Sequence, residues 1–96
     1  MYSIRFEWNE KKNRENQRKH GVSFEEAQTV FLDENAMEFF DSDHSELEDR
    51  FILLGVSVRS RILVVCYCHR QSNAIRLISA RKASNNEEKY YWETFK

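Results

Sequence analysis

Hydrophobic and polar positions in the first part of the chain predict a strand followed by a helix. Residues 4–8 alternate apolar and charged side chains, which is the period-two pattern of a half-buried strand. A polar segment, residues 10–20, comes next. Asn9 is a residue type that caps helix starts, and Gly21 suits the position after a helix end. We therefore expect a helix that begins after Asn9 and ends at about residue 20.

A second helix is expected to begin at Ser23, because Ser-Phe-Glu-Glu has the capping-box pattern. Apolar side chains then recur at helical spacing and form one stripe. That stripe consists of Phe24, Ala27, Val30 and Phe31. A short strand over residues 36–40 follows, and then a polar loop over residues 41–46 with turn chemistry.

The second half of the chain is rich in β-type runs. Three of them, residues 50–58, 62–69 and 74–80, are separated by short polar turns at 59–60 and 71–72, which predicts a meander. Ser84 is placed to cap a final helix. The order βααββββα groups most strands after the helices. This order predicts one small α+β domain over residues 1–96, with a mainly antiparallel sheet packed by helices.

The faces of the sheet follow if both turns are two-residue hairpins. Arg50 would then lie opposite His69, Tyr67 opposite Arg76, and Ile62 beside Arg81. In that register, one face holds Arg50, Ile52, Leu54, Val56, Val58, Leu63, Val65, Tyr67, His69, Arg76, Ile78 and Ala80. A slip of one residue exchanges the two faces. In either register Arg76 lies mid-strand among apolar residues, and its guanidinium needs a partner or an opening into a cleft.

Charge is strongly partitioned along the chain, although the formal net charge is only −1. Residues 21–49 carry ten acidic side chains and no Lys or Arg, whereas residues 50–86 carry no acid. The cations of the second segment are Arg50, Arg59, Arg61, Arg70, Arg76, Arg81 and Lys82. A basic sheet surface favours a polyanion such as RNA, and the acidic segment can supply internal partners that orient the arginines.

The composition and motifs of the chain argue against several other classes of function. No apolar run approaches the roughly 20 residues that span a bilayer. The first residues also lack the apolar core of a signal peptide, so we expect a cytoplasmic protein without a membrane partner. Cys66 and Cys68 are interpreted as small buried side chains, not as a disulfide or a zinc site. Because no Gly-rich phosphate loop or metal-ligand spacing is present, we expect no cofactor and no metal.

Four blocks of the sequence resemble the BrnT family, the toxins of type II toxin–antitoxin pairs. The blocks are residues 6–9 (FEWN), residues 19–27 (KHGVSFEEA), residues 43–45 with Glu48 and residues 50–51, and residues 78–83 (ISARKA). Asn9 departs from the Asp usual in the family, and Cys-Tyr-Cys replaces a mostly aliphatic run. The resemblance implies a RelE-like fold and a metal-independent endoribonuclease that inhibits translation. It also implies a cognate BrnA-type antitoxin that neutralises the toxin, and a complex that binds operator DNA through the antitoxin.

Metal-free RNA cleavage needs cations that stabilise the charge on phosphorus while the 2′-OH attacks. Arginine suits this task because its planar fork binds phosphate in two places. The first candidates are Arg81, Arg50 and Arg76. For each arginine the alternative is a structural pair with a carboxylate.

Proton transfer could come from His44, which lies in the polar loop near Asp43 and Glu48 in the sequence. Glu48 is a candidate base, or it holds Arg50 or another arginine of the sheet. Candidate substrate contacts are Lys19, His20, Arg61, Lys82 and Tyr90. For His20 helix capping is the alternative, and for Tyr90 it is core packing. The competing function is a non-catalytic module that binds RNA or an antitoxin and acts as a corepressor.

Overall fold

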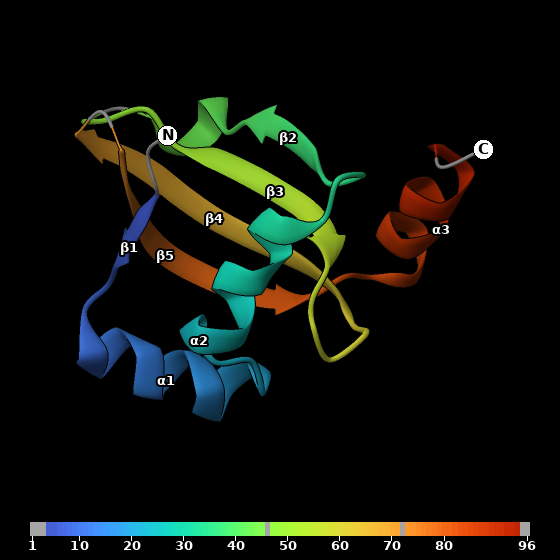
Figure 1. Cartoon of the computed structure of the whole chain (residues 1–96), viewed down its shortest axis with the longest axis horizontal. Helices are drawn as coiled ribbons and strands as arrows, with labels where there is room; N and C mark the ends of the chain where they lie inside the picture. Colours follow the sequence, from blue (N-terminus) through green and yellow to red (C-terminus); the bar gives the residue numbers. More distant parts are fainter. Residues whose placement is uncertain (1–3, 46, 72, 95–96) are drawn as a thin grey trace.

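The computed structural model describes residues 4–45, 47–71 and 73–94 of the 96-residue chain. Its elements follow the predicted order βααββββα, with two 3₁₀ turns added (Figure 1). They are β1 (Arg5–Glu7), α1 (Glu10–His20), α2 (Phe24–Ala27), η1 (Gln28–Leu32), β2 (Met37–Phe40), η2 (Ser42–His44), β3 (Phe51–Val56), β4 (Ile62–Gln71), β5 (Ala74–Lys82) and α3 (Asn85–Thr94). None of the described helices has the length and apolarity that crossing a membrane requires.

The strands form one sheet in the order β1-β5-β4-β3-β2. The pairs β2–β3, β3–β4 and β4–β5 are antiparallel, as a meander requires. β1 instead lies parallel to β5, with Arg5 opposite Ala74 and Glu7 opposite Arg76. The described sheet is therefore mixed, with one parallel pair and three antiparallel pairs, and β1 forms its edge beside β5.

The starts of α1 and α2 and the end of α1 lie where the sequence predicts them. The side chain of Asn9 accepts a hydrogen bond from the backbone N–H of Lys12 at 3.0 Å. Gly21 ends α1 with φ +70°, in the left-handed region that favours glycine. Ser23 Oγ accepts from the backbone N–H of Glu26 at 3.0 Å, which confirms the predicted cap of the second helix.

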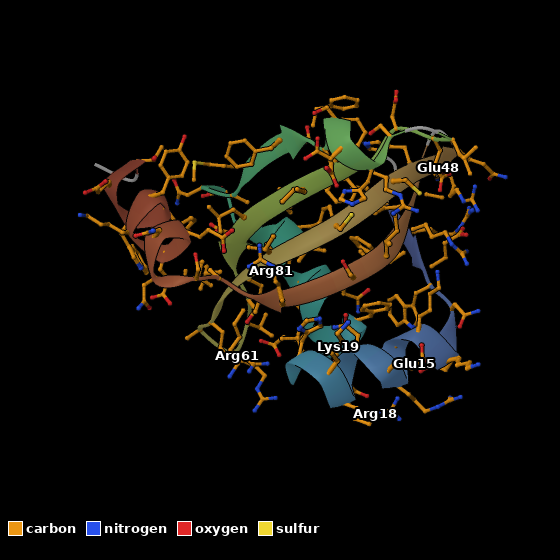
Figure 2. The ribbon with its side chains drawn as sticks, turned by 180° about the vertical axis from the view of Figure 1, so that it is seen from behind. Glu15, Arg18, Lys19, Glu48, Arg61 and Arg81 are labelled. Carbon is orange, nitrogen blue, oxygen red and sulfur yellow. The ribbon has the colours of Figure 1, made fainter. Side chains whose placement is uncertain are left out.

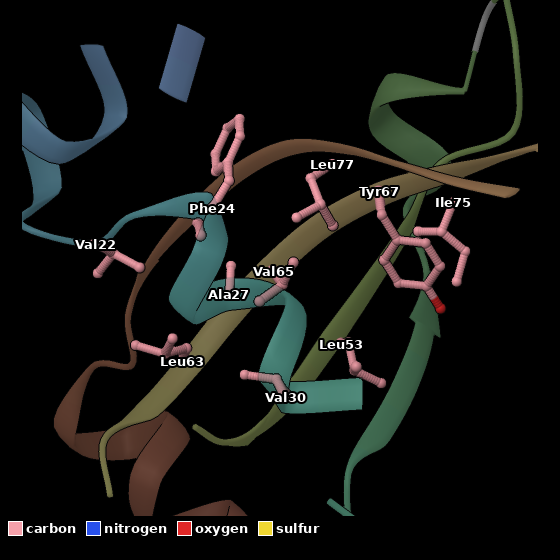
Figure 3. Packing of buried hydrophobic residues seen from close by; sticks show 11 residues of the cluster. Val22, Phe24, Ala27, Val30, Leu53, Leu63, Val65, Tyr67, Ile75 and Leu77 are labelled. Atoms are coloured by element: carbon pink, nitrogen blue, oxygen red, sulfur yellow. The ribbon is translucent and has the colours of Figure 1, made fainter. Parts of the chain in front are cut away.

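The helices α1 and α2 cover one face of the sheet, and the main core lies between them and the strands (Figures 1 and 3). Phe24, Ala27 and Val30 of the predicted stripe are fully buried there. Asn16, buried on α1, fixes the layers: its amide donates to Val22 O at 2.8 Å and to Ala80 O at 2.7 Å, and its Oδ1 accepts from Ala80 N. This pairing holds α1 against β5, the strand that also carries Arg81.

The other face of the sheet is covered only at one end, by α3 (Figures 1 and 2). The helix is anchored by Tyr91, which is 1% exposed and whose hydroxyl donates to Asp33 Oδ2 at 2.6 Å. Burial and this hydrogen bond raise the pKa of the Tyr91 hydroxyl. Most of this face, which we call the open face, is therefore available for a site.

The predicted register between β3 and β4 is wrong by one residue. The connection is longer than two residues: Val56 pairs with Ile62, and Ser57 N donates to Arg61 O at 2.9 Å. Ser60 adopts φ +62° in this turn. Phe51 consequently lies opposite Tyr67, and the expected pair of Arg50 with His69 does not form.

A bulge at Ile78 moves the register between β4 and β5 as well, because Cys66 pairs with Ser79 but Tyr67 pairs with Leu77. Nearer the turn a second irregularity lies between His69 and Gln71, and between the two irregularities Arg76 lies opposite Cys68, not opposite Tyr67. Beyond the Ile78 bulge Arg81 lies opposite Val64, not beside Ile62. Together the two shifts redistribute the predicted faces. Leu63, Val65 and Tyr67 join the covered core, while Ile52, Val64 and Cys66 face the open side with Arg81. Both cysteines are free, Cys68 fully buried and Cys66 partly buried.

Candidate active site

A cavity of about 250 Å³ lies on the open face, where β3, β4 and β5 meet the loop before β3. Its floor includes Ile52, Val64 and Cys66. The polar side chains around it are His20, Asp41, His44, Arg50, Ser79 and Arg81. Four of the residues predicted from the sequence, Arg50, Arg81, His44 and His20, thus meet here although they come from distant parts of the chain.

Arg50 has a buried side-chain donor that no described residue satisfies. Its Nε is buried and has no hydrogen-bond partner within the described part of the chain, and no described carboxylate forms an ion pair with its guanidinium. Burial raises the pKa of the nearby Cys66 thiol, and the charge of Arg50 opposes that rise. A buried donor without an acceptor is costly, so an anion that enters the cavity would gain by meeting Arg50.

Arg81 reaches the cavity from β5 but is held by α3 (Figure 2). Its Nη1 and Nη2 donate to the two carboxylate oxygens of Glu87 at 2.8 and 3.0 Å. Glu87 also accepts from the backbone N–H of Ser84, whose hydroxyl accepts from Glu87 N, so the pair forms a capping box. Arg81, together with these helix-start bonds, lowers the pKa of Glu87 to about 2. The carboxylate therefore occupies the fork that a phosphate would use.

His44 is positioned by an acid that the sequence analysis missed. Its Nδ1 lies 3.1 Å from Asp41 Oδ2, whereas the sequence had suggested Asp43 and Glu48 as neighbours. Ser45 Oγ donates to Asp41 O at 2.6 Å and accepts from Arg50 N at 3.0 Å, which closes the loop. With Nδ1 engaged, Nε2 is the nitrogen left for a substrate. An Asp three residues before a His at the start of a turn is the signal that could have revealed this pair.

Glu48 and Arg76, the other two predicted catalytic residues, lie in ion pairs. Glu48 accepts from Arg70 at 3.3 Å, and it lines a second, neighbouring hollow of about 230 Å³ that also involves His44 and Arg50. Arg76 donates to Glu7 of β1 at 3.1 Å and does not line the main cavity. For Arg76 the geometry favours the structural alternative.

The remaining predicted substrate contacts do not line the cavity. Arg61 donates to Glu26 and, at 3.0 Å, to Gly21 O. Lys19 and Lys82 are exposed and do not line the cavity, and Lys19 lies on α1 below the open face in Figure 2. Tyr90 lines an adjacent groove.

Glu87 and Ser79 were also missed by the sequence analysis. The Ser84-x-x-Glu87 spacing was a usable signal for Glu87, which follows Arg81 by six residues. Nothing in the sequence marks Ser79. Within the described residues, no three His, Cys, Asp or Glu side chains lie together as metal ligands would.

Comparison with known proteins agrees with the resemblance seen in the sequence. The model of a family described as the BrnT ribonuclease toxin of type II toxin–antitoxin systems matches residues 8–87. The 1.1 Å crystal structure of the Brucella abortus ribonuclease toxin BrnT is similar, with a TM-score of 0.67 and 26% sequence identity. That match covers 86% of this chain and 100% of the Brucella chain. A search of curated proteins finds no match.

These matches establish a BrnT-like fold, and the wider likeness to RelE-type toxins stays a prediction. Membership of a type II toxin family also implies an antitoxin partner. The chain belongs to the BrnT family of ribonuclease toxins of type II toxin–antitoxin systems.

Proposed function

We propose that this toxin is a metal-independent endoribonuclease that cleaves RNA at the Arg50–Arg81 cavity. The observation that carries the proposal is the buried Nε of Arg50, which has no partner among the described residues and lies at a hollow that Arg81 and His44 also line. Two guanidinium groups that converge on one hollow can hold a phosphodiester and stabilise the additional negative charge of its transition state.

In the proposed reaction the 2′-OH of one nucleotide attacks the adjacent phosphorus. The 2′-O–P bond forms, the P–O5′ bond breaks, and the products end in a 2′,3′-cyclic phosphate and a 5′-hydroxyl. Nε2 of His44 takes the 2′-OH proton or returns a proton to the leaving oxygen, and His20 supplies the complementary group. Arg81 exchanges the Glu87 carboxylate for a phosphate as RNA enters.

The same geometry suggests how a BrnA-type antitoxin neutralises the toxin. Glu87 demonstrates that a carboxylate fits the fork of Arg81. An antitoxin that presents carboxylates to Arg81 and Arg50, or that covers the cavity, would exclude RNA. The toxin would inhibit translation by cutting RNA in the cytoplasm until this partner binds, and the complex would reach operator DNA through the antitoxin.

Cleavage of end-labelled RNA in EDTA tests the proposal. We expect the purified toxin to cut, Arg50→Ala to lose about 10²-fold or more in rate, and Arg59→Ala to cut normally. Arg59 is a matched control because it is an exposed arginine of the β3–β4 turn outside the cavity. Tight RNA binding without any cut, at any protein excess, would favour the non-catalytic corepressor, and an Arg50→Ala variant of undiminished activity would place the site elsewhere.

A further inference from the structure

A second hollow, the α3 groove, lies beside the cavity on the open face. It measures about 320 Å³ and is bounded by β2, β3, β4 and α3. Its floor is formed by Ile52, Leu54 and Val64. Ile52 and Val64 also line the cavity, so the two hollows adjoin each other.

The α3 groove has aromatic walls that remain half open to water. Phe39 on β2 is 40% exposed and Tyr90 on α3 is 50% exposed, and their ring centroids lie 6.3 Å apart. An apolar floor beside two half-exposed rings is suited to a flat group with a π face, because each ring gains contact area when such a group covers it.

The rim of the groove is polar and leads directly to the cavity. The amide of Asn86 makes no hydrogen bond to any described residue, so it is available to both donors and acceptors. Glu87 lines the groove, and its carboxylate holds Arg81, which lines the cavity. A ligand at Arg81 is therefore next to the rim of the groove.

We propose that the α3 groove binds a nucleobase of the RNA strand, on a nucleotide adjoining the phosphate held by Arg50 and Arg81. The inference rests on the proposed function. One sugar separates a base from its phosphate, and here an apolar, aromatic hollow directly adjoins a cationic one. The π face of the base would lie on Tyr90 or Phe39, and its polar edge would meet the Asn86 amide.

Tyr90 gives the most direct variant, because its ring is half exposed and its removal leaves the core intact. Loss of stacking on one base typically weakens binding about fivefold to hundredfold. Tyr90→Ala should bind RNA more weakly by that factor. Tyr90→Phe should bind almost as tightly as the wild type, because the ring remains. Phe40→Ala is the matched control: Phe40 is the next residue on β2, is 54% exposed, and does not line the groove.

The substrate for the test is a deoxyoligonucleotide with a single ribonucleotide, which confines cleavage to one phosphate. In two further versions the base is removed from the ribonucleotide or from the nucleotide after it. We expect the wild type to cleave one of the two abasic strands more slowly than the intact strand, by the factor that stacking contributes, and to cleave the other abasic strand normally. Tyr90→Ala should be slow on the intact strand and no slower on that abasic strand, since base and ring act as a pair.

The inference would be overturned if wild type and Tyr90→Ala cleaved the intact strand equally fast. It would also be overturned if removal of the ring and removal of the base slowed cleavage independently of each other. A Tyr90→Ala variant that handles RNA normally but binds its antitoxin weakly would overturn it as well, and would assign the groove to the antitoxin. If the wild type cuts no strand, the proposed activity fails, and binding of the intact and abasic all-deoxy strands still tests the groove by the same comparison.

Discussion

Two arginines of the acid-free segment show how one residue type takes opposite roles. The guanidinium of Arg61 donates to Glu26 and to Gly21 O, and the hydrogen bond to Glu26 raises the pKa of Arg61. Arg50 lines a cavity, and its buried Nε donates a hydrogen bond to no described group. A satisfied arginine stabilises the fold, whereas an unsatisfied one at a hollow is available to a ligand.

Asp41→Asn should separate proton transfer from binding. Asparagine can donate to Nδ1 of His44 and so favour the tautomer that carries its proton on Nε2, which is the wrong form for a base. We expect kcat of Asp41→Asn to fall by about 10²-fold or more with little change in KM. The kcat of His44→Ala should fall by a comparable factor. The neighbouring Asp43→Asn serves as control. An Asp41→Asn variant with wild-type kcat and an unchanged pH–rate profile would refute the role.

Glu87→Gln should release Arg81 for RNA. The carboxylate competes with phosphate for the same fork, and because the pKa of Glu87 is about 2, mild acid does not remove this competition. A partly exposed pair of this kind contributes about 0.2–1 kcal/mol, so RNA affinity should rise by up to about fivefold. Titration of a non-cleavable deoxy strand, with Glu88→Gln as control, measures the change. Weaker binding by Glu87→Gln alone would show that Glu87 instead orients Arg81 productively.

At the scale of elements, Glu26 ties α2 to the β3–β4 turn. Its side chain is 4% exposed and accepts from Ser57 Oγ at 2.7 Å and from Arg61 Nε at 2.9 Å. Thr29 adds a second tie, since its Oγ1 accepts from Val58 N. The turn therefore depends on a helix that lies about thirty residues earlier in the chain.

Glu26→Gln should destabilise the fold by about 1–3 kcal/mol at neutral pH, because Arg61, which is only partly buried, loses its counter-charge but keeps its hydrogen bond to Gly21 O. The hydrogen bond from Arg61 is the main cause that lowers the pKa of Glu26. The stabilisation is therefore complete above the ordinary Glu value of about 4.3 and is lost as the pH falls through the lower native value. Urea unfolding should show the gap between wild type and Glu26→Gln narrowing in acid, while the exposed Glu34→Gln stays near wild type. A gap independent of pH would contradict the assignment.

Elements were predictable from local signals, whereas the register was not. Asn9, Gly21 and Ser23 act within one turn of themselves, so the sequence alone places both helix starts and the end of α1. The β3–β4 register depends instead on Ser60 at φ +62° in a turn held by Glu26. A contact with a distant helix overrides the two-residue turn that local preference favours.

The candidate site divides in the same way. Charge partition and the family blocks indicated Arg50, Arg81 and His44, since residue type suffices to suggest a phosphate clamp and a proton carrier. Their partners Asp41 and Glu87 were missed, because each pairing depends on how a loop or a helix closes onto the sheet.

Across the whole molecule, the arginines draw partners from more of the chain than expected. The acidic segment does supply internal partners: Glu26 pairs with Arg61 and Glu48 with Arg70. Glu7 and Glu87, near the two ends of the chain, pair with Arg76 and Arg81. The acidic segment therefore accounts for only part of the internal neutralisation.

RNA affinity should depend on salt with a slope set by the number of phosphates bound. Each neutralised phosphate of a single strand contributes a slope of about −0.7 in log K against log salt. Arg50 and Arg81 together predict about −1.4 or steeper, and Arg81→Ala should reduce the magnitude by about 0.7. Titrations of a deoxy strand at several NaCl concentrations measure the slope, with Arg59→Ala as control. A slope near zero would exclude a phosphate clamp.

The parallel pairing of β1 with β5 makes the start of the sheet depend on a strand near the end of the chain. A ribosome makes Arg5–Glu7 first, and their partners on β5 come about seventy residues later. Until β5 is made, the chain lacks Arg81, the strand that joins β1 to β4, and the Ala80 contact that holds α1 against the sheet. Long-range pairing of this kind forms late. The cavity, and with it the ribonuclease activity proposed above, can therefore form only after β5 has been synthesised.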